Sequence, residues 1–238
     1  MKKFNSLLLA VIGLLCCMSV SAYDFEVNGI YYNITSELDK TVKVTVHGDG
    51  NTEYSGTISI PVSVYYNGDA YTVTSIGDYA FWRCPNLTYV SISHSVTNIG
   101  DYAFSYCSGL TSIVIPNSLT DIGIGTFSGC SGLTSVEIPN SVTNIGANAF
   151  SNCSGLTSVV FPNRVTSIGE RSFQGCSSLS SVVIPNSVTS IGVEAFIGCS
   201  ALTSITLPNS VTNIGQGLFS YCSSLTSISI PNSVTSIG

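Results

Sequence analysis

Seven of the nine cysteines in this 238-residue sequence have the widest range of possible chemistry, because they follow a pattern and thiols can form disulfides, bind metals or act as nucleophiles. They recur at a constant interval of 23 residues, and each stands three residues after a phenylalanine. The seven are Cys84, Cys107, Cys130, Cys153, Cys176, Cys199 and Cys222. Cysteine ligands of a metal usually cluster at short spacings such as C-x-x-C, so this interval does not predict a metal site.

A constant interval favours cysteines that point the same way in successive coils of a stack. Neighbouring coils would lie about 4.8 Å apart, whereas a disulfide requires Cβ atoms that converge to about 3.8 Å. An odd number of cysteines also leaves at least one thiol unpaired. The sequence therefore predicts buried, reduced thiols that pack as small apolar side chains, and pairing of some of them is the alternative.

Other groups that could support catalysis are sparse. The sequence has two histidines, His47 and His94, and neither recurs in the repeat. A serine nucleophile needs a base and an acid within reach, and the many serines here fall in repeat register, which indicates a polar surface. The sequence also lacks a glycine-rich phosphate loop, an H-E-x-x-H pair and an EF-hand acid series. We therefore predict a non-enzymatic protein with no catalytic residues, no metal site and no cofactor.

The elements that position the cysteines follow from the repeat, and the unit that begins at Leu110 is representative. Its alternating apolar residues predict a short strand with one side facing inward. Pro116 ends the strand because proline has no N–H to donate, and Asn117 is a typical turn residue. The recurrent Ile-Gly pair predicts a second corner, where glycine permits a backbone setting that a side chain would oppose. Before the cysteine we predict about one helical or 3₁₀ turn, with Phe127 in the core.

The unit L-T-S-V-x-I-P-N-S-V-T-x-I-G-x-x-A-F-x-x-C resembles the leucine-rich repeats of the BspA-like family of bacterial and protist surface proteins. The resemblance extends over roughly residues 71–238. It implies a right-handed leucine-rich-repeat solenoid, carried by secreted or surface-displayed proteins of which several are considered adhesins. It implies no active site, because the family is a repeat type without fixed catalytic residues.

Three segments are predicted along the chain. Residues 1–22 resemble a cleaved signal peptide, with a basic start, an apolar run and the small residues of Val20-Ser21-Ala22. Residues 23–70 hold alternating runs broken by Asn-Gly pairs and predict a β-rich cap over the first coil, with an independent binding element as the alternative. Residues 71–238 form the solenoid, which ends in the middle of a repeat without a C-terminal cap. We expect a truncated or fragmentary product there, and a longer natural protein or an end covered by another molecule are the alternatives.

Charge and hydropathy restrict the possible partners. Without Lys2 and Lys3 of the signal peptide, five basic residues face thirteen acidic ones, so the mature net charge is 5 − 13 = −8. Binding to nucleic acid or to an anionic membrane depends on clustered Lys and Arg, so neither is predicted. No segment after residue 22 is long and apolar enough to span a bilayer, which needs about 20 residues. We expect a secreted or cell-surface protein.

The outward positions of the strands form the predicted binding surface, because they can vary without harming the core. The candidate residues are Tyr89, Ser91, Ser112, Val114, Ser135, Glu137, Ser158, Val160, Ser181, Val183, Ser204, Thr206, Ser227 and Ser229. This face is poor in the Tyr, Trp and Arg that usually dominate binding energy, so the affinity of a single copy is expected to be modest. The sequence predicts adhesin-like binding to an extracellular or host protein. The alternatives are a glycan-binding surface and a structural spacer that self-associates through its uncapped end.

The opposite rim of the repeat is more varied, from Asp101-Tyr102 to Gln216-Gly217, and specificity would lie there if it depends on variation. Neutral variation of solvated linkers is the favoured interpretation of this rim. Trp82 and Arg83 are interpreted as packing of the first coil, with a binding anchor as the alternative.

Overall fold

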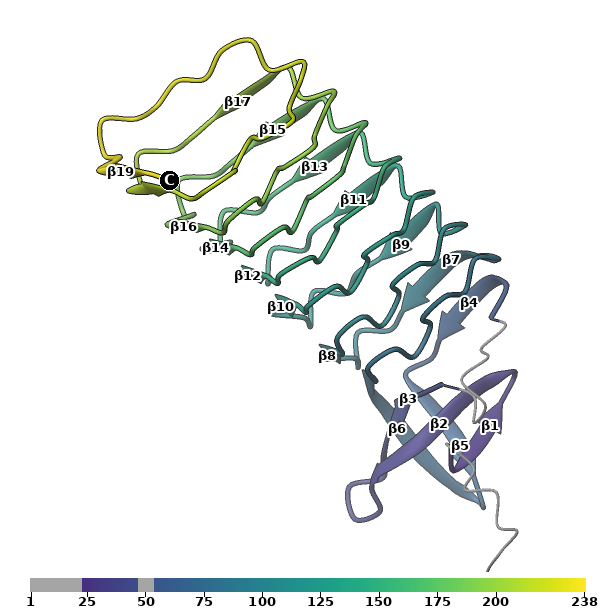
Figure 1. The fold of residues 1–238 in the computed structure, drawn as a ribbon. Coiled ribbons are helices and arrows are strands. Elements are labelled where there is room, and N and C mark those ends of the chain that lie inside the picture. The colour runs from purple at the N-terminus through teal and green to yellow at the C-terminus, as the bar shows by residue number, and fades with distance from the viewer. Residues whose placement is uncertain (1–22, 47–53) are drawn as a thin grey trace, which may run out of the picture.

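A computed structural model of the protein describes residues 23–46 and 54–238. The predicted signal peptide and His47 lie outside the described residues. Within them the chain forms a stack of coils with a small crossed sheet at its N-terminal end (Figure 1). Equivalent strands of successive coils pair with residues 23 positions apart, as in Ser135 with Ser158, so the interval of the cysteines is the length of one coil. The predicted solenoid of 23-residue coils is confirmed.

The N-terminal sheet has the strand order β1-β2-β3-β6-β5, and strand β8 of the stack extends it by pairing with β6. Its strands are β1 (Phe25–Val27), β2 (Ile30–Ser36), β3 (Thr41–Val44), β5 (Ser63–Tyr66) and β6 (Asp69–Ile76). The Asn-Gly pairs form two of its hairpin turns, because Asn28, Gly29, Asn67 and Gly68 all have positive φ, as a two-residue hairpin turn requires.

Tyr54 joins this sheet to the first coil. Its ring lies 4.6 Å from the ring of Phe81, centroid to centroid. Its buried hydroxyl accepts the Tyr31 N–H at 3.1 Å and donates to the Thr45 carbonyl at 3.3 Å, so the phenol is satisfied. Strand β4 (Gly56–Ile60) follows and pairs in parallel with β7 (Leu87–Ile92). The segment predicted to be the cap therefore also contributes the first strand of the stack.

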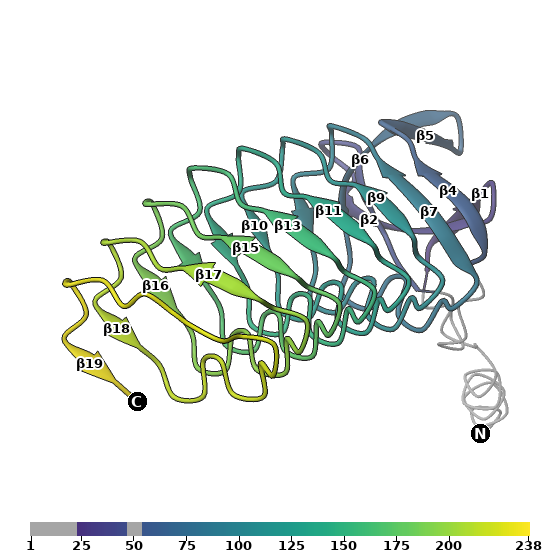
Figure 2. The same ribbon diagram turned by 90° about the horizontal axis from the view of Figure 1, so that it is seen from above.

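Each coil contributes one strand to a long row and one to a short row, on different sides of the stack (Figures 1 and 2). The long row is β4, β7, β9 (Ser112–Val114), β11 (Ser135–Glu137), β13 (Ser158–Val160), β15 (Ser181–Val183) and β17 (Ser204–Thr206). The short row is β8 (Asn98–Ile99), β10 (Asp121–Ile122), β12 (Asn144–Ile145), β14 (Ser167–Ile168), β16 (Ser190–Ile191), β18 (Asn213–Ile214) and β19 (Ser236–Ile237). The pairings within both rows are parallel, as the strand pattern predicts.

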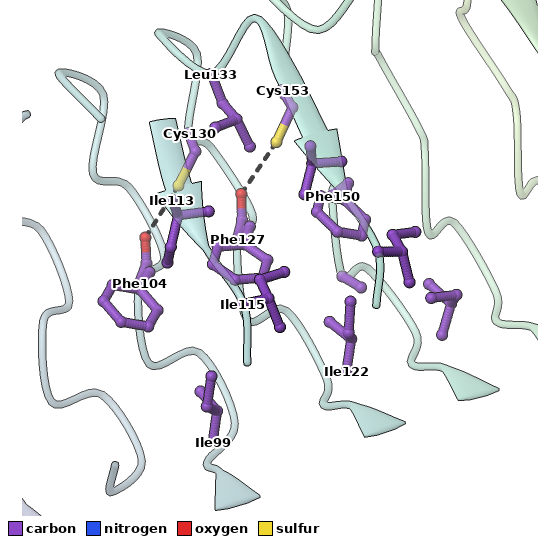
Figure 3. Close-up of a cluster of buried hydrophobic side chains, with 14 of the residues drawn as sticks. Ile99, Phe104, Ile113, Ile115, Ile122, Phe127, Cys130, Leu133, Phe150 and Cys153 are labelled. Carbon is purple, nitrogen blue, oxygen red and sulfur yellow. Dashed lines mark hydrogen bonds between the residues drawn. The ribbon is translucent and has the colours of Figure 1, made fainter. Parts of the chain in front are cut away.

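Phenylalanines fill the centre of the stack. The ring centroids of successive coils lie 4.9 to 6.1 Å apart, and their planes are within 17° of parallel. Figure 3 shows Phe104, Phe127 and Phe150 in this column, with Ile115 and Ile122 packed beside them. Each ring is buried by the coils before and after it, so no coil buries its apolar side chains alone.

The cysteines form a second buried column next to the phenylalanines. Each thiol from Cys107 onward donates to the phenylalanine carbonyl of the preceding coil; Cys130 reaches the Phe104 oxygen and Cys153 the Phe127 oxygen, both at 3.1 Å (Figure 3). All seven cysteines of the repeat are buried and in the thiol form. The thiol therefore packs as a small apolar group and also gives a buried carbonyl a hydrogen bond.

The helical or 3₁₀ turn predicted in each coil is wrong. The described residues contain no helix, and two positions per coil have left-handed backbone with φ between 50° and 75°. The first set is Tyr79, Tyr102, Gly125, Asn148, Arg171, Glu194 and Gly217, and the second is Arg83, Tyr106, Gly129, Asn152, Gly175, Gly198 and Tyr221. Left-handed residues cannot continue a right-handed helix. Alternate N–H groups instead donate to the next coil, as Tyr102 does to Ile124 at 2.8 Å and Phe104 to Thr126 at 2.9 Å.

Glycine follows isoleucine in the recurrent Ile-Gly pairs for a reason other than the predicted one. Their φ is not positive, but successive coils approach closely there. A Cβ on Gly169 would lie 2.6 Å from the backbone nitrogen of Ala147, and one on Gly192 would lie 2.4 Å from that of Glu170. At Gly169 and Gly192 glycine is needed because a side chain would collide with the preceding coil, and not because of the backbone setting.

Candidate binding surface

The long row presents the predicted candidate residues together on one outward face. In strands β9, β11, β13, β15 and β17 the middle residue is buried and its two neighbours are exposed. The parallel register places Tyr89 beside Ser112 and Glu137 beside Val160, and Thr206 forms a bridge with Ser229. Tyr89 and Ser91 are only half-buried, and the other twelve candidates are exposed.

Two columns of hydroxyls on this face differ in their availability. In the first column most hydroxyls donate to the carbonyl of the preceding coil, as Thr157 does to Thr134 at 3.1 Å and Thr203 to Ser180 at 3.2 Å. These hydroxyls fasten one coil to the next. The neighbouring column includes Ser158 and Ser181. Its hydroxyls form no hydrogen bond with any residue in the described ranges 23–46 and 54–238. Those hydroxyls are open to a ligand.

An apolar stripe runs beside the hydroxyls. Val114 is 52% exposed, Val160 is 70% exposed and Val183 is 76% exposed, and Glu137 interrupts the stripe between the first two. Exposed valines on a sheet face leave apolar area in water that a partner could cover.

A hollow of about 390 Å³ lies at the Val114 end of this stripe. Its outer lining includes Val114, Glu137 and Val160 of the strands and Pro139 and Pro162 of the following turns. Glu137 is exposed and makes no ion pair among the residues that the structure describes, so its carboxylate is available at the edge of an apolar wall. The hollow combines one charge with apolar contact area, a combination that suits recognition of a side chain or a small polar group.

The central cysteines of the stack are protected from reaction. Burial raises the pKa of Cys153 to about 12, and burial likewise raises the pKa of the Cys130 and Cys176 thiols well above the ordinary value. A nucleophilic or metal-binding cysteine needs an accessible thiolate. Over 23–46 and 54–238 the structure also shows no group of three or more His, Cys, Asp or Glu side chains that could hold a metal ion. His94 is exposed, in the turn after β7.

A cluster of aromatic side chains lies at the edge of the first coils, where the sequence favours packing of Trp82 and Arg83 and leaves a binding anchor as the alternative. We call Tyr79, Trp82, Arg83, Tyr102 and Tyr106 the aromatic edge. The Tyr79 and Tyr102 rings stack at 5.3 Å with planes 6° apart, and the Arg83 guanidinium lies 4.3 Å from the Trp82 ring centroid. Tyr79 and Tyr106 are about half exposed, at 47% and 53%. The sequence signal was present, because large residues stand here at positions where later coils have glycine.

Comparison with known proteins matches residues 68–157 and 143–238 to the family described as "BspA type Leucine rich repeat region (6 copies)". A solved leucine-rich repeat protein from Bacteroides ovatus is 36% identical, with a TM-score of 0.83 over 91% of this chain. The present chain spans only 55% of that protein's length. A leucine-rich repeat protein of T. pallidum is 28% identical with a TM-score of 0.58, over 90% of this chain and 86% of that one. No curated protein matches the chain. The described part of the chain holds no helix with the length and apolar character to cross a membrane.

Proposed function

Because the chain belongs to the BspA-type leucine-rich repeat family, we propose that it is an exported or cell-surface, non-enzymatic interaction protein that binds an extracellular or host protein, in the manner of an adhesin. The observation that carries the proposal is the outward face of the long row, which exposes valines and available hydroxyls on a regular scaffold.

The dimensions of this face support a protein partner. Seven parallel strands at about 4.8 Å each extend for about 30 Å, and a standard interface covers about 800 Å² per partner. The apolar stripe and the hollow at Glu137 give this area both apolar contact and one charge. A regular β-face also loses little conformational freedom on binding, which favours association.

The test is binding of residues 23–238 to an array of extracellular-matrix proteins and glycans, with the mass of the protein measured by light scattering in the same buffer. We expect saturable binding of a protein by the monomer. The double variant Val160→Ser, Val183→Ser should weaken that binding, because it removes the most exposed apolar side chains of the stripe. Asn98→Ser is the matched control, because it lies in the short row where other coils carry serine.

Absence of any saturable protein binding would contradict the proposal. Binding that only glycans compete for would favour a carbohydrate-binding surface instead. If the valine variant and the Asn98→Ser control bind the partner equally well, a protein partner is still supported, but its binding site lies outside the strand face.

Self-association is a second candidate, favoured by the apolar surface of the last coil. Ile230 is 46% exposed and Ile237 is 63% exposed there, and Phe219, Leu225 and Val234 are only partly buried. A second copy could cover these side chains. Light scattering distinguishes this candidate, because it predicts a mass that rises with protein concentration while the long row stays free to bind.

A further inference from the structure

The aromatic edge occupies backbone positions where large side chains are unfavourable. Tyr79, Arg83, Tyr102 and Tyr106 have φ of 56°, 55°, 55° and 61°. A left-handed setting is disfavoured for any residue with a Cβ and is free of that strain only for glycine. In later coils the equivalent positions include Gly125, Gly129, Gly175, Gly198 and Gly217. The other later positions hold two asparagines and the large residues Arg171, Glu194 and Tyr221. Only the first two coils therefore carry a large residue at both left-handed positions.

Core packing does not explain these residues. Tyr79 is 47% exposed, Tyr106 is 53% exposed and Arg83 is exposed. They contact one another: Tyr79 meets the edge of Trp82 at 6.3 Å, and the Arg83 guanidinium lies 6.0 Å from the Tyr106 centroid. The Tyr102 and Tyr106 rings also lie over Gly125 and Gly129 at the surface of the next coil. Strained residues that are not needed to fill the core mark functional sites more often than other positions.

The charges around this edge indicate what it binds. Asp78 accepts the Asp101 N–H at 2.9 Å, and Asp101 accepts the Ile124 N–H at 2.9 Å, so one oxygen of each carboxylate is held against the backbone of the next coil and neither carboxylate pairs with Arg83. Arg83 forms no ion pair with any residue that the structure describes. Its guanidinium lies over the Trp82 ring, with donors left for an incoming carboxylate.

We infer that the aromatic edge is the primary docking site of the partner, and that it binds an acidic segment of that protein with apolar residues beside the carboxylate. Arg83 pairs with the carboxylate, and Trp82 and Tyr106 cover the neighbouring apolar side chain. Tyr, Trp and Arg are the residues that dominate binding energy at protein interfaces, and within the solenoid they gather here. The inference rests on the proposed function and names the partner's chemistry.

The probe is an immobilised library of short peptides that combine Asp or Glu with Leu and Pro, compared with a library in which Asn and Gln replace the acids. We expect residues 23–238 to bind the acidic library and not the amide library. The double variant Arg83→Gly, Tyr106→Gly should bind at least about tenfold more weakly and should unfold at an equal or higher urea concentration, because glycine relieves the left-handed strain. Arg83→Gln, which keeps the size of the side chain, should lose binding as well.

Tyr221→Gly is the matched control, because Tyr221 occupies the same backbone position as Tyr106, with φ of 61° and 82% exposure, at the other end of the stack. It should bind like the wild type. Equal binding of both libraries, binding of neither, or unchanged binding by the Arg83 variants would overturn the inference. A matrix protein that binds the wild type and the double variant equally would overturn it too, while leaving the proposed function in place.

Discussion

Gly198→Ala distinguishes the left-handed backbone of the structure from the helical turn that the sequence predicts, because the two give opposite signs. Gly198 has φ of 72°, and a Cβ there would meet only Gly175 atoms at 3.6 Å, which is ordinary contact. The substitution therefore changes backbone preference without a collision. A left-handed setting costs an L-residue about 1–2 kcal/mol, and the loss of chain freedom in the unfolded state offsets about 0.4–1 kcal/mol of this.

We expect Gly198→Ala to lower the free energy of unfolding by about 0.8 kcal/mol, the difference between the midpoints of these two effects. In a helical turn the same change would raise it by about 0.8–1 kcal/mol, because alanine is the better helix former. Urea unfolding of residues 23–238, followed by circular dichroism, measures the difference. Gly215→Ala is the control, because its φ is not positive and its Cβ would meet atoms only at 3.5 Å; it should be neutral or slightly stabilising. A Gly198→Ala protein that is more stable than the wild type would refute the assignment of the turn.

Three further predictions concern the stack. Phe150→Ala should lower the free energy of unfolding by about 3–5 kcal/mol. Phe219→Ala should lower it by clearly less, because Phe219 is partly buried and has one ring neighbour, at 6.1 Å. Equal losses in urea unfolding would contradict a stack in which each coil buries the rings of its neighbours. Gly169→Ala should cost about 1–3 kcal/mol through collision with the preceding coil, and a stability equal to that of Gly215→Ala would show that the coils do not approach so closely. The free energy of unfolding should also fall as pH rises above about 9. Unfolded thiols lose their protons near their ordinary pKa, while the folded Cys153 thiol, whose pKa is raised to about 12, keeps its proton. The unfolded state then binds fewer protons than the folded state, and each such thiol lowers the free energy of unfolding by up to about 1.4 kcal/mol per pH unit. Urea midpoints that do not change between pH 8 and pH 10 would contradict this burial.

Most of the fold could be predicted from the 23-residue interval of the repeat. Equal spacing of Phe and Cys predicts stacked coils with those residues inside, and the alternating apolar residues before each proline predict the parallel strands of the long row. The candidate residues fall on one face for the same reason, because residues two apart on a strand point the same way. Whether that face binds a protein is a separate matter that the interval does not decide.

Two features depend on contacts between coils, which a single unit does not display. The segment from Asp101 to Tyr106 is compatible with a helical turn by composition, but its N–H groups find acceptors in the next coil instead. A signal for this was available, since glycine and asparagine recur at the two left-handed positions. No feature of a single unit indicates the close approach of coils at the Ile-Gly corner, because it depends on the distance between neighbouring backbones.

The most direct test of the account is amide hydrogen exchange on residues 23–238, alone and saturated with the matrix protein that binds best on the array. We predict slower exchange in the first coils, at the aromatic edge and in β7, and along the long row toward β13. Protection restricted to the N-terminal sheet, or an unchanged exchange pattern in a saturated complex, would contradict binding through the solenoid surface.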